Sequence, residues 1–123
     1  MITIITRYED TQMPRDVDRQ MWRQLKGAFR VDKLIFVEDD KQLEDALMGT
    51  SDLGDHVFLE PLGGKTVKDI PTGDIVMVVG NTAMNNRAWA EADEEYSISC
   101  PSLPTHLYGI NAAAIALAFR HGQ

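Results

Sequence analysis

The sequence has little of several features that would mark a particular class of protein. Cys100 is its only cysteine, so it can form neither an intramolecular disulfide nor a cysteine-based zinc cluster. Its longest strongly apolar stretch, Ile110 to Phe119, is about half as long as a membrane crossing requires. Met1 to Ile5 lacks the basic start and the length of a signal peptide. These absences predict a cytoplasmic protein without a membrane segment.

Positive charge is also scarce. Twelve Lys and Arg stand against 19 Asp and Glu, which gives a net charge of −7. Such a surface is not basic throughout and cannot clamp a nucleic acid by neutralising phosphates everywhere, so a site for RNA must be a local patch. With 123 residues, 44% of them hydrophobic, the chain can bury one ordinary core. We therefore expect a single domain over residues 1–123.

Short strands are predicted along the whole chain. The clearest covers Asp74 to Val79, where five consecutive apolar residues indicate a strand covered on both faces, as in a parallel sheet between helices. Pro61 to Gly73 holds three glycines and two prolines, and is expected to be a loop. The other strands are predicted at Ile2–Thr6, Lys33–Val37, His56–Leu59 and Tyr96–Ile98.

Helices are predicted between these strands. Asp16 to Phe29 repeats apolar residues at steps of three and four, and Asp39 or Asp40 can cap a second helix that Gly49 would end. The alternation of strands and helices predicts an α/β fold with a mostly parallel sheet flanked by helices. The inward residues expected for these two helices are Val17, Met21, Leu25 and Ala28 or Phe29, then Leu43, Ala46 and Leu47. Further helices are predicted at Met84–Ala92 and Leu107–Arg120.

Two loops that follow strands are candidates for a binding site, because ligands of open α/β sheets sit beyond the carboxyl ends of the strands. Gly80 ends the buried strand, and its missing side chain either lets a flat ligand approach the backbone or merely permits the turn. The second loop, Ser99 to His106, holds two prolines and precedes an alanine-rich helix. Such a thin helix lets another backbone pack close to it.

Four segments together resemble the SPOUT superfamily of α/β-knot RNA methyltransferases. "IVMVVGNTAM", Ile75 to Met84, is similar to the family's buried strand ending in Gly-Asn-Glu. "EADEEYSISCP", Glu91 to Pro101, resembles its Ala-Asp pair, short strand and Ile-Pro loop, and "HLYGINAAAIAL", His106 to Leu117, its Ser-Leu-Asn helix start. "PRDVDRQMWRQLKGAFRVDKLIFVE", Pro14 to Glu38, is similar to its first motif, so the resemblance covers most of the chain.

This resemblance implies a C-terminal trefoil knot, a homodimer, and S-adenosylmethionine bound between the knotted loops. Members of the most similar branch methylate ribose 2′-hydroxyls of transfer or ribosomal RNA. The chemistry needs an electrophilic methyl group held in line with the hydroxyl, and a group that takes up the proton. By position, the resemblance assigns the cofactor contacts to Leu59, Glu60, Gly80, Ile98, Ser99, Cys100 and Leu107.

Several positions depart from the family's pattern. Trp22 stands where the family has a helix arginine, with Arg23 one residue later, and His106 replaces the serine of the last motif. Arg23 as cation and His106 as general base are the candidate catalytic substitutes, since histidine titrates near neutrality. Alternatively, His106 caps the next helix or faces water, and Trp22 packs in the core or a dimer interface. The remaining changes are Asp16 for Asn, Thr82 for Glu and Tyr108 for Asn.

These changes leave three hypotheses open. The first is a small S-adenosylmethionine-dependent RNA ribose methyltransferase. The second is a SPOUT-like dimer that binds partners as a scaffold and has lost catalysis. The third is an unknotted α/β ligand-binding domain. No metal site is expected, because the histidines and carboxylates match no metal-ligand spacing.

Overall fold

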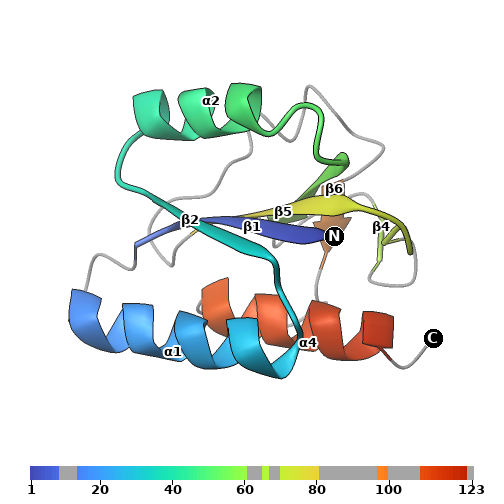
Figure 1. Ribbon diagram of the computed structural model, residues 1–123, viewed down its shortest axis with the longest axis horizontal. Coiled ribbons are helices and arrows are strands. Elements are labelled where there is room, and N and C mark those ends of the chain that lie inside the picture. The colour runs from blue at the N-terminus through green and yellow to red at the C-terminus, as the bar shows by residue number, and fades with distance from the viewer. Residues whose placement is uncertain (9–13, 61–64, 67–69, 81–96, 100–108, 122–123) are drawn as a thin grey trace.

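A six-stranded sheet forms the centre of the protein (Figure 1). The computed structural model describes residues 1–8, 14–60, 65–66, 70–80, 97–99 and 109–121. All strand pairs are parallel, and the order in the sheet is β2-β1-β5-β3-β6-β4. The expected α/β class with a parallel sheet is therefore confirmed. The strands are β1 Ile2–Arg7, β2 Lys33–Val37, β3 Asp55–Glu60, β4 Lys65–Thr66, β5 Ile75–Val79 and β6 Ser97–Ser99.

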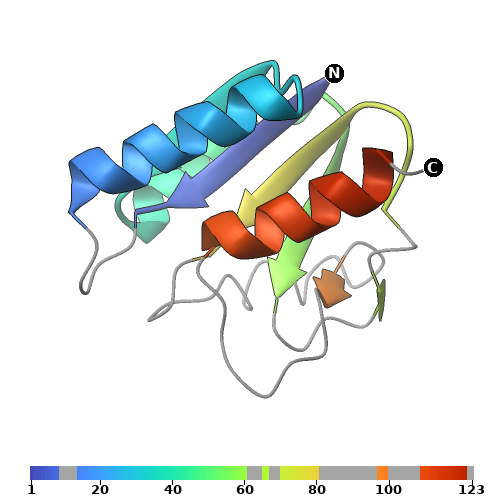
Figure 2. The ribbon, with the colours of Figure 1, turned by 90° about the horizontal axis from the view of Figure 1, so that it is seen from below.

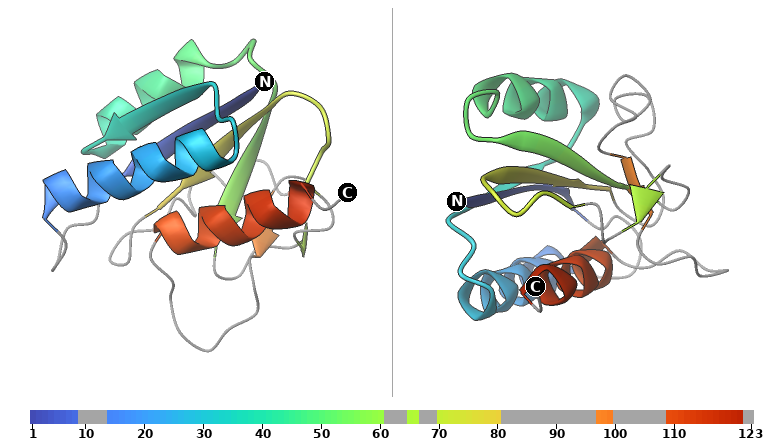
Figure 3. Two further views of the ribbon diagram at one scale, coloured as in Figure 1. Left: turned by 60° about the horizontal axis from the view of Figure 1, so that its bottom comes forward. Right: turned by 90° about the vertical axis from the view of Figure 1, so that its right-hand side faces the viewer.

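Helices cover both faces of the sheet (Figures 1 and 3). Helix α2, Asp40–Gly49, lies over one face, and α1, Arg15–Ala28, and α4, Gly109–His121, lie over the other. Figure 2 shows α1 and α4 side by side, and the two helices are in contact. Within the part of the chain that the structure describes, no helix is long and apolar enough to cross a membrane.

Strand β5 lies at the centre of the core. All five of its residues are buried, as its unbroken apolar sequence predicts. Ile75, Met77 and Val79 belong to the cluster that includes residues of α1 and α4. Val76 and Val78 join the cluster on the α2 side. A strand buried on both faces gains apolar burial from every residue, which explains why alternation is absent from its sequence.

Helix α1 packs on the sheet through Leu25, Met21 and Phe29, as its sequence predicts, but one predicted inward residue points outward. Val17 was expected to point inward, but it is 44% exposed, whereas Trp22 is 1% exposed in the core. The physical reason is size, because burying the largest aromatic side chain gains more than burying a valine. The interpretation of Trp22 as a core residue is confirmed. The buried residues of the helix are Asp18, Trp22 and Leu25.

The ends of the helices follow their local sequence. Asp39 caps α2, as expected, by accepting a hydrogen bond from the backbone N–H of Gln42 at 2.8 Å. Gly49 is the last residue of this helix rather than the residue after it. Beyond α1, Arg30 adopts a left-handed φ of 54° and the N–H of Val31 donates to the carbonyl of Lys26, which is a Schellman ending that usually carries glycine.

The remaining strand and helix predictions differ from the structure by short distances. β6 begins and ends one residue later than predicted, and α4 begins at Gly109 within the described residues. The expected loop Pro61 to Gly73 contains the two-residue strand β4, which pairs with β6. The helix predicted at Met84–Ala92 lies outside the described residues.

Candidate carboxyl-edge site

The connections of the sheet diverge from the neighbouring strands β1 and β5. From β1 the chain continues to β2 on one side, whereas from its neighbour β5 it continues to β6 on the other side. In open α/β sheets, connections that diverge in this way leave a ligand-sized crevice beyond the carboxyl ends of the strands. The ends of β1, β5, β3 and β6 therefore form the candidate site, which we call the carboxyl edge.

The strand register brings five predicted cofactor residues together at this edge. Leu59 pairs with Val79 of β5 on one side and with Ile98 of β6 on the other. Glu60 pairs with Ser99, and Gly80 directly follows Val79. The five residues come from three separate segments of the chain and occupy one end of three neighbouring strands. Two further predicted contacts, Cys100 and Leu107, lie outside the described residues.

Helix α4 begins against the same edge. A Cβ atom on Gly109 would lie 2.6 Å from the carbonyl oxygen of Gly80 and 2.7 Å from Cγ1 of Val79, so only glycine allows this approach. Ala113 and Ala116, further along the helix, are fully buried. The close approach of another backbone to this helix is therefore made at Gly109 and not at the alanines on which the expectation was based.

The predicted catalytic residues are not brought together by the described part of the structure. Arg23 lies on α1 with its side chain exposed, next to the buried Trp22. His106 lies outside the described residues. The position where the family has its arginine is thus occupied by a core residue, and the neighbouring cation points to solvent.

Arg7 is a site residue that the sequence argument missed. It ends β1, one residue past the pair formed by Thr6 and Val79, which places it level with Gly80 across the neighbouring strand. Its side chain is 2% exposed and forms an ion pair with Asp40 at the start of α2. Burying a guanidinium costs free energy unless the group is paired. The ion pair with Asp40 therefore stabilises Arg7 at the carboxyl edge. The sequence signal that could have found Arg7 is a charged residue directly after the β-branched run Ile2 to Thr6.

An aromatic and cationic cluster stands next to Arg7. Tyr8 stacks on Phe36 with ring centroids 4.8 Å apart and an interplanar angle of 15°. The guanidinium of Arg15 lies 4.5 Å from the Tyr8 ring centroid, and that of Arg19 lies 5.4 Å away. Arg19 also donates to the Tyr8 hydroxyl from Nε at 2.9 Å and from Nη2 at 2.6 Å. This hydrogen bond raises the pKa of Arg19 above its ordinary value.

The chemical character of the carboxyl edge divides in two. Around β3, β5 and β6 the residues that end the strands are mostly apolar or lack a side chain, which suits a flat ligand held by backbone groups. Around β1 and β2 the edge carries arginines and an aromatic ring, together with Asp40 and Glu38, which pair with Arg7 and Arg15. Among the described residues, no three His, Cys, Asp or Glu side chains gather into a group that could hold a metal ion.

Comparison with known proteins adds no relative. No protein-family model matches the sequence, and no curated protein sequence matches it. The fold therefore defines the class. The protein is an α/β protein with a parallel sheet, and its connections diverge from the neighbouring strands β1 and β5.

Proposed function

We propose that this protein binds S-adenosylmethionine at the carboxyl edge and has the α/β-knot fold of SPOUT RNA methyltransferases. One observation carries the proposal. The resemblance assigns seven cofactor contacts from the sequence, and the five that are described, Leu59, Glu60, Gly80, Ile98 and Ser99, lie at the ends of three adjacent strands. These segments meet because β5, β3 and β6 are adjacent and parallel, which places the assigned contacts where a ligand of an open α/β sheet would bind.

The local chemistry fits a nucleoside ligand. Leu59 is 6% exposed and offers an apolar environment, whereas Gly80 has no side chain to obstruct a flat ring. The described pairing of β3 with β6 ends at Glu60 and Ser99, at the same edge as Gly80. When bound, S-adenosylmethionine supplies an electrophilic methyl group.

The path of the C-terminal segment supports the knotted topology. β6 lies beyond β3, yet α4 returns to β5 and packs its first residue, Gly109, on Gly80. At the other end of α4, Arg120 donates to the carbonyls of Pro71 at 3.1 Å and Thr72 at 2.7 Å, and also to that of Gly73. Both ends of α4 thus contact the residues that flank β5, which is consistent with a C-terminal segment that returns to the middle of the sheet.

A second candidate function is binding without catalysis. Trp22, which stands at the family's arginine position, is packed in the core, so this position cannot present a cation to a substrate. Arg23 and His106 are the proposed substitutes for the active enzyme, Arg23 as the cation and His106 as the proton acceptor. If neither serves, the protein is a SPOUT-like scaffold that keeps the cofactor edge.

Calorimetric titration with S-adenosylmethionine and S-adenosylhomocysteine tests the proposal. We expect saturable binding that Gly80→Val abolishes, because the added side chain enters the ligand's place. Gly73→Ala is the matched control, since a Cβ atom there meets nothing within 4 Å. Thermal unfolding of both variants verifies that they fold. Absence of binding to the native protein at millimolar ligand overturns the proposal.

A labelled-methyl assay on bulk transfer and ribosomal RNA then separates the two candidate functions. Transfer that is lost in His106→Ala supports the methyltransferase. Cofactor binding without methyl transfer supports the scaffold.

A further inference from the structure

A stripe of cations runs along one side of α1. Arg15, Arg19, Arg23 and Lys26 follow one another at steps of four, four and three residues, which places all four on one side of a helix. The three arginines are exposed and Lys26 is half-buried. We call these four residues the basic stripe. Arg30 continues it just beyond the helix.

The side of α1 that carries the stripe is fixed by contacts at its beginning. Arg15 forms an ion pair with Glu38, which follows β2, and Arg15 and Arg19 both lie on the Tyr8 ring. Tyr8 in turn stacks on Phe36 of β2. The stripe therefore faces the edge strand β2 and begins at the carboxyl edge of the sheet.

Most of the charge on the stripe is uncompensated. Arg15 is the one member with an ion pair to another described residue. The partner of Arg19 is the neutral hydroxyl of Tyr8, and Arg23 and Lys26 have no ion pair with the described part of the chain. Three positive charges are thus available to an external anion.

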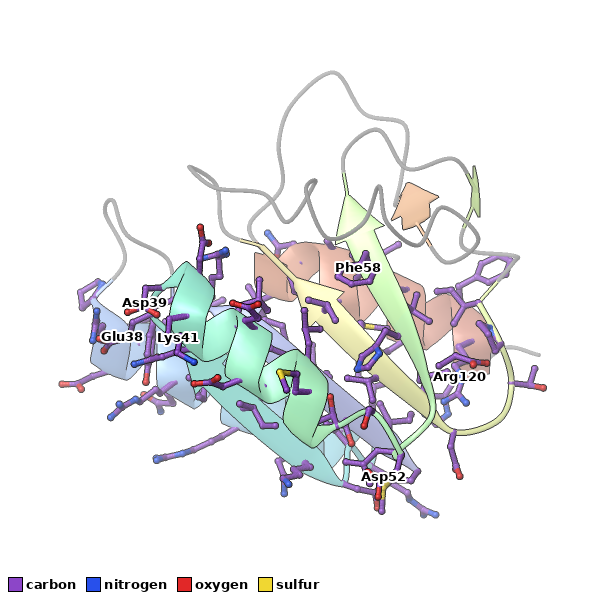
Figure 4. The ribbon with its side chains drawn as sticks, turned by 90° about the horizontal axis from the view of Figure 1, so that it is seen from above. Glu38, Asp39, Lys41, Asp52, Phe58 and Arg120 are labelled. Carbon is purple, nitrogen blue, oxygen red and sulfur yellow. The ribbon has the colours of Figure 1, made fainter. Side chains whose placement is uncertain are left out.

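The charge of the molecule is strongly divided. Residues 15–30 carry five cations and two carboxylates, a net charge of +3, so the other residues carry −10 of the total of −7. Figure 4 shows the α2 side of the molecule, where Asp39 and Asp52 lie near the two ends of α2 and Lys41 lies on the helix. Among the described helices, α2 carries three carboxylates and one lysine, so a polyanion is attracted to α1 rather than to α2.

We propose that the basic stripe binds the phosphodiester backbone of RNA and leads the strand to the carboxyl edge. This inference rests on the proposed function, in which a methyltransferase would act on RNA. The stripe spans 11 residue steps, about 16 Å at 1.5 Å per residue, which is enough for several consecutive phosphates of one strand. Its beginning at Tyr8 lies beside Arg7, level with Gly80, so RNA that follows the stripe arrives at the proposed cofactor.

Nucleic acid fits the stripe better than other polyanions do. Three of its four cations are arginines, whose planar guanidinium groups match phosphate oxygens in a bidentate manner. A membrane surface would need large apolar side chains next to the cations, but Val17, the exposed large apolar residue of α1, lies on another side of the helix from the stripe. The stripe contacts phosphates, which are the same in every RNA sequence, so it contributes affinity. Selection of the substrate nucleotide would take place at the carboxyl edge.

Fluorescence anisotropy with a 5′-labelled 12-nucleotide RNA tests the proposal. In about 50 mM KCl we expect a dissociation constant in the range of about 1–100 μM, which is usual for non-specific binding. The triple variant Arg19→Gln/Arg23→Gln/Lys26→Gln should bind at least about tenfold more weakly. The slope of log K against log salt concentration should fall by about 2, because each phosphate contact on a single strand contributes about 0.7.

Two single substitutions provide matched controls. Arg23→Gln and Lys41→Gln each remove one exposed cation, on opposite faces of the sheet. The first should weaken RNA binding about threefold and the second should leave it unchanged. Glu38→Gln should strengthen binding, because it releases Arg15 from its ion pair. Thermal unfolding confirms that each variant folds.

The outcomes distinguish this inference from the proposed function. Equal losses in Arg23→Gln and Lys41→Gln, or binding of the native protein to phosphatidylserine vesicles but not to RNA, overturn the stripe. A DNA strand of the same sequence shows whether the backbone alone is recognised. If S-adenosylmethionine binds and RNA does not, the inference is wrong and the cofactor proposal stands. If RNA binds and S-adenosylmethionine does not, the cofactor proposal is wrong and the assignment of RNA binding to the stripe stands.

Discussion

Replacing Thr3 by valine should stabilise the protein. Thr3 is fully buried in β1, between Lys33 of β2 and Val76 of β5. Its hydroxyl oxygen has no hydrogen-bond partner among the residues that the structure describes. By alternation along β1, the side chain shares its face with Ile5, which belongs to the cluster beneath α2. The hydroxyl is thus dehydrated without compensation.

The size of the effect follows from this environment. A buried polar group without a partner costs about 1–3 kcal/mol, and valine has nearly the shape of threonine, so no cavity or overlap offsets the gain. We expect Thr3→Val to raise the free energy of unfolding by about 1–2 kcal/mol. For a domain of this size, this gain corresponds to a rise of about 4–8 °C in Tm.

Urea and thermal unfolding monitored by circular dichroism measure the change. Thr50→Val is the control, because the same substitution there removes a hydroxyl that bonds the Ala46 carbonyl at 2.8 Å and Nε2 of His56 at 2.9 Å. The control should lose about 1–2 kcal/mol, and the urea m-value should stay constant in both variants. If Thr3→Val is neutral or destabilising, the hydroxyl has a partner and the reasoning is refuted.

Three further predictions concern the backbone and one surface charge. Arg30→Gly should stabilise the protein by roughly 0.5–1 kcal/mol in urea unfolding, because it removes the cost of φ 54° from a residue with a Cβ atom. Gly109→Ala should cost about 2 kcal/mol by overlap with Gly80, and the same assay would show an unchanged midpoint if α4 could shift freely. The hydrogen bond from the Met1 ammonium group lowers the pKa of Asp74. Its contribution to stability is therefore present above about pH 4 and is lost as the pH falls through the lowered pKa. In an NMR titration this pKa should return toward its ordinary value after acetylation of the amine, and a normal pKa in the unmodified protein would contradict the assignment.

The parts of the fold that the sequence predicts are those governed by local physics. The apolar run of β5 can only be satisfied in a strand covered on both faces, and Asp39 caps α2 because its short carboxylate reaches the N–H of Gln42. The order of the strands depends on contacts between distant segments, so local patterns do not contain it. β4 was missed for this reason, since its two residues are a strand solely through their pairing with β6.

The candidate site shows the same division. The resemblance selects Leu59, Gly80 and Ile98 from three segments, but the strand register is needed to show that they are neighbours. Arg7 carries no motif, and its significance comes from its burial and from its place level with Gly80. A charged residue after a strand becomes informative once the neighbouring strand is known.

The burial of Trp22 connects the departure from the family's pattern with the basic stripe. Because Trp22 takes the inward place, Arg23 is turned by about 100° along the helix and joins Arg19 and Lys26 on the outer side. Restoring the family's residue by Trp22→Arg would not restore catalysis, since it would place a guanidinium without a partner at a site that is 1% exposed. We expect this variant to lose at least about 3 kcal/mol of stability, whereas Arg23→Gln should keep the fold and lose RNA affinity. If Trp22→Arg instead folds normally and increases methyl transfer, position 22 faces the substrate, and the assignment of Arg23 to the stripe is wrong.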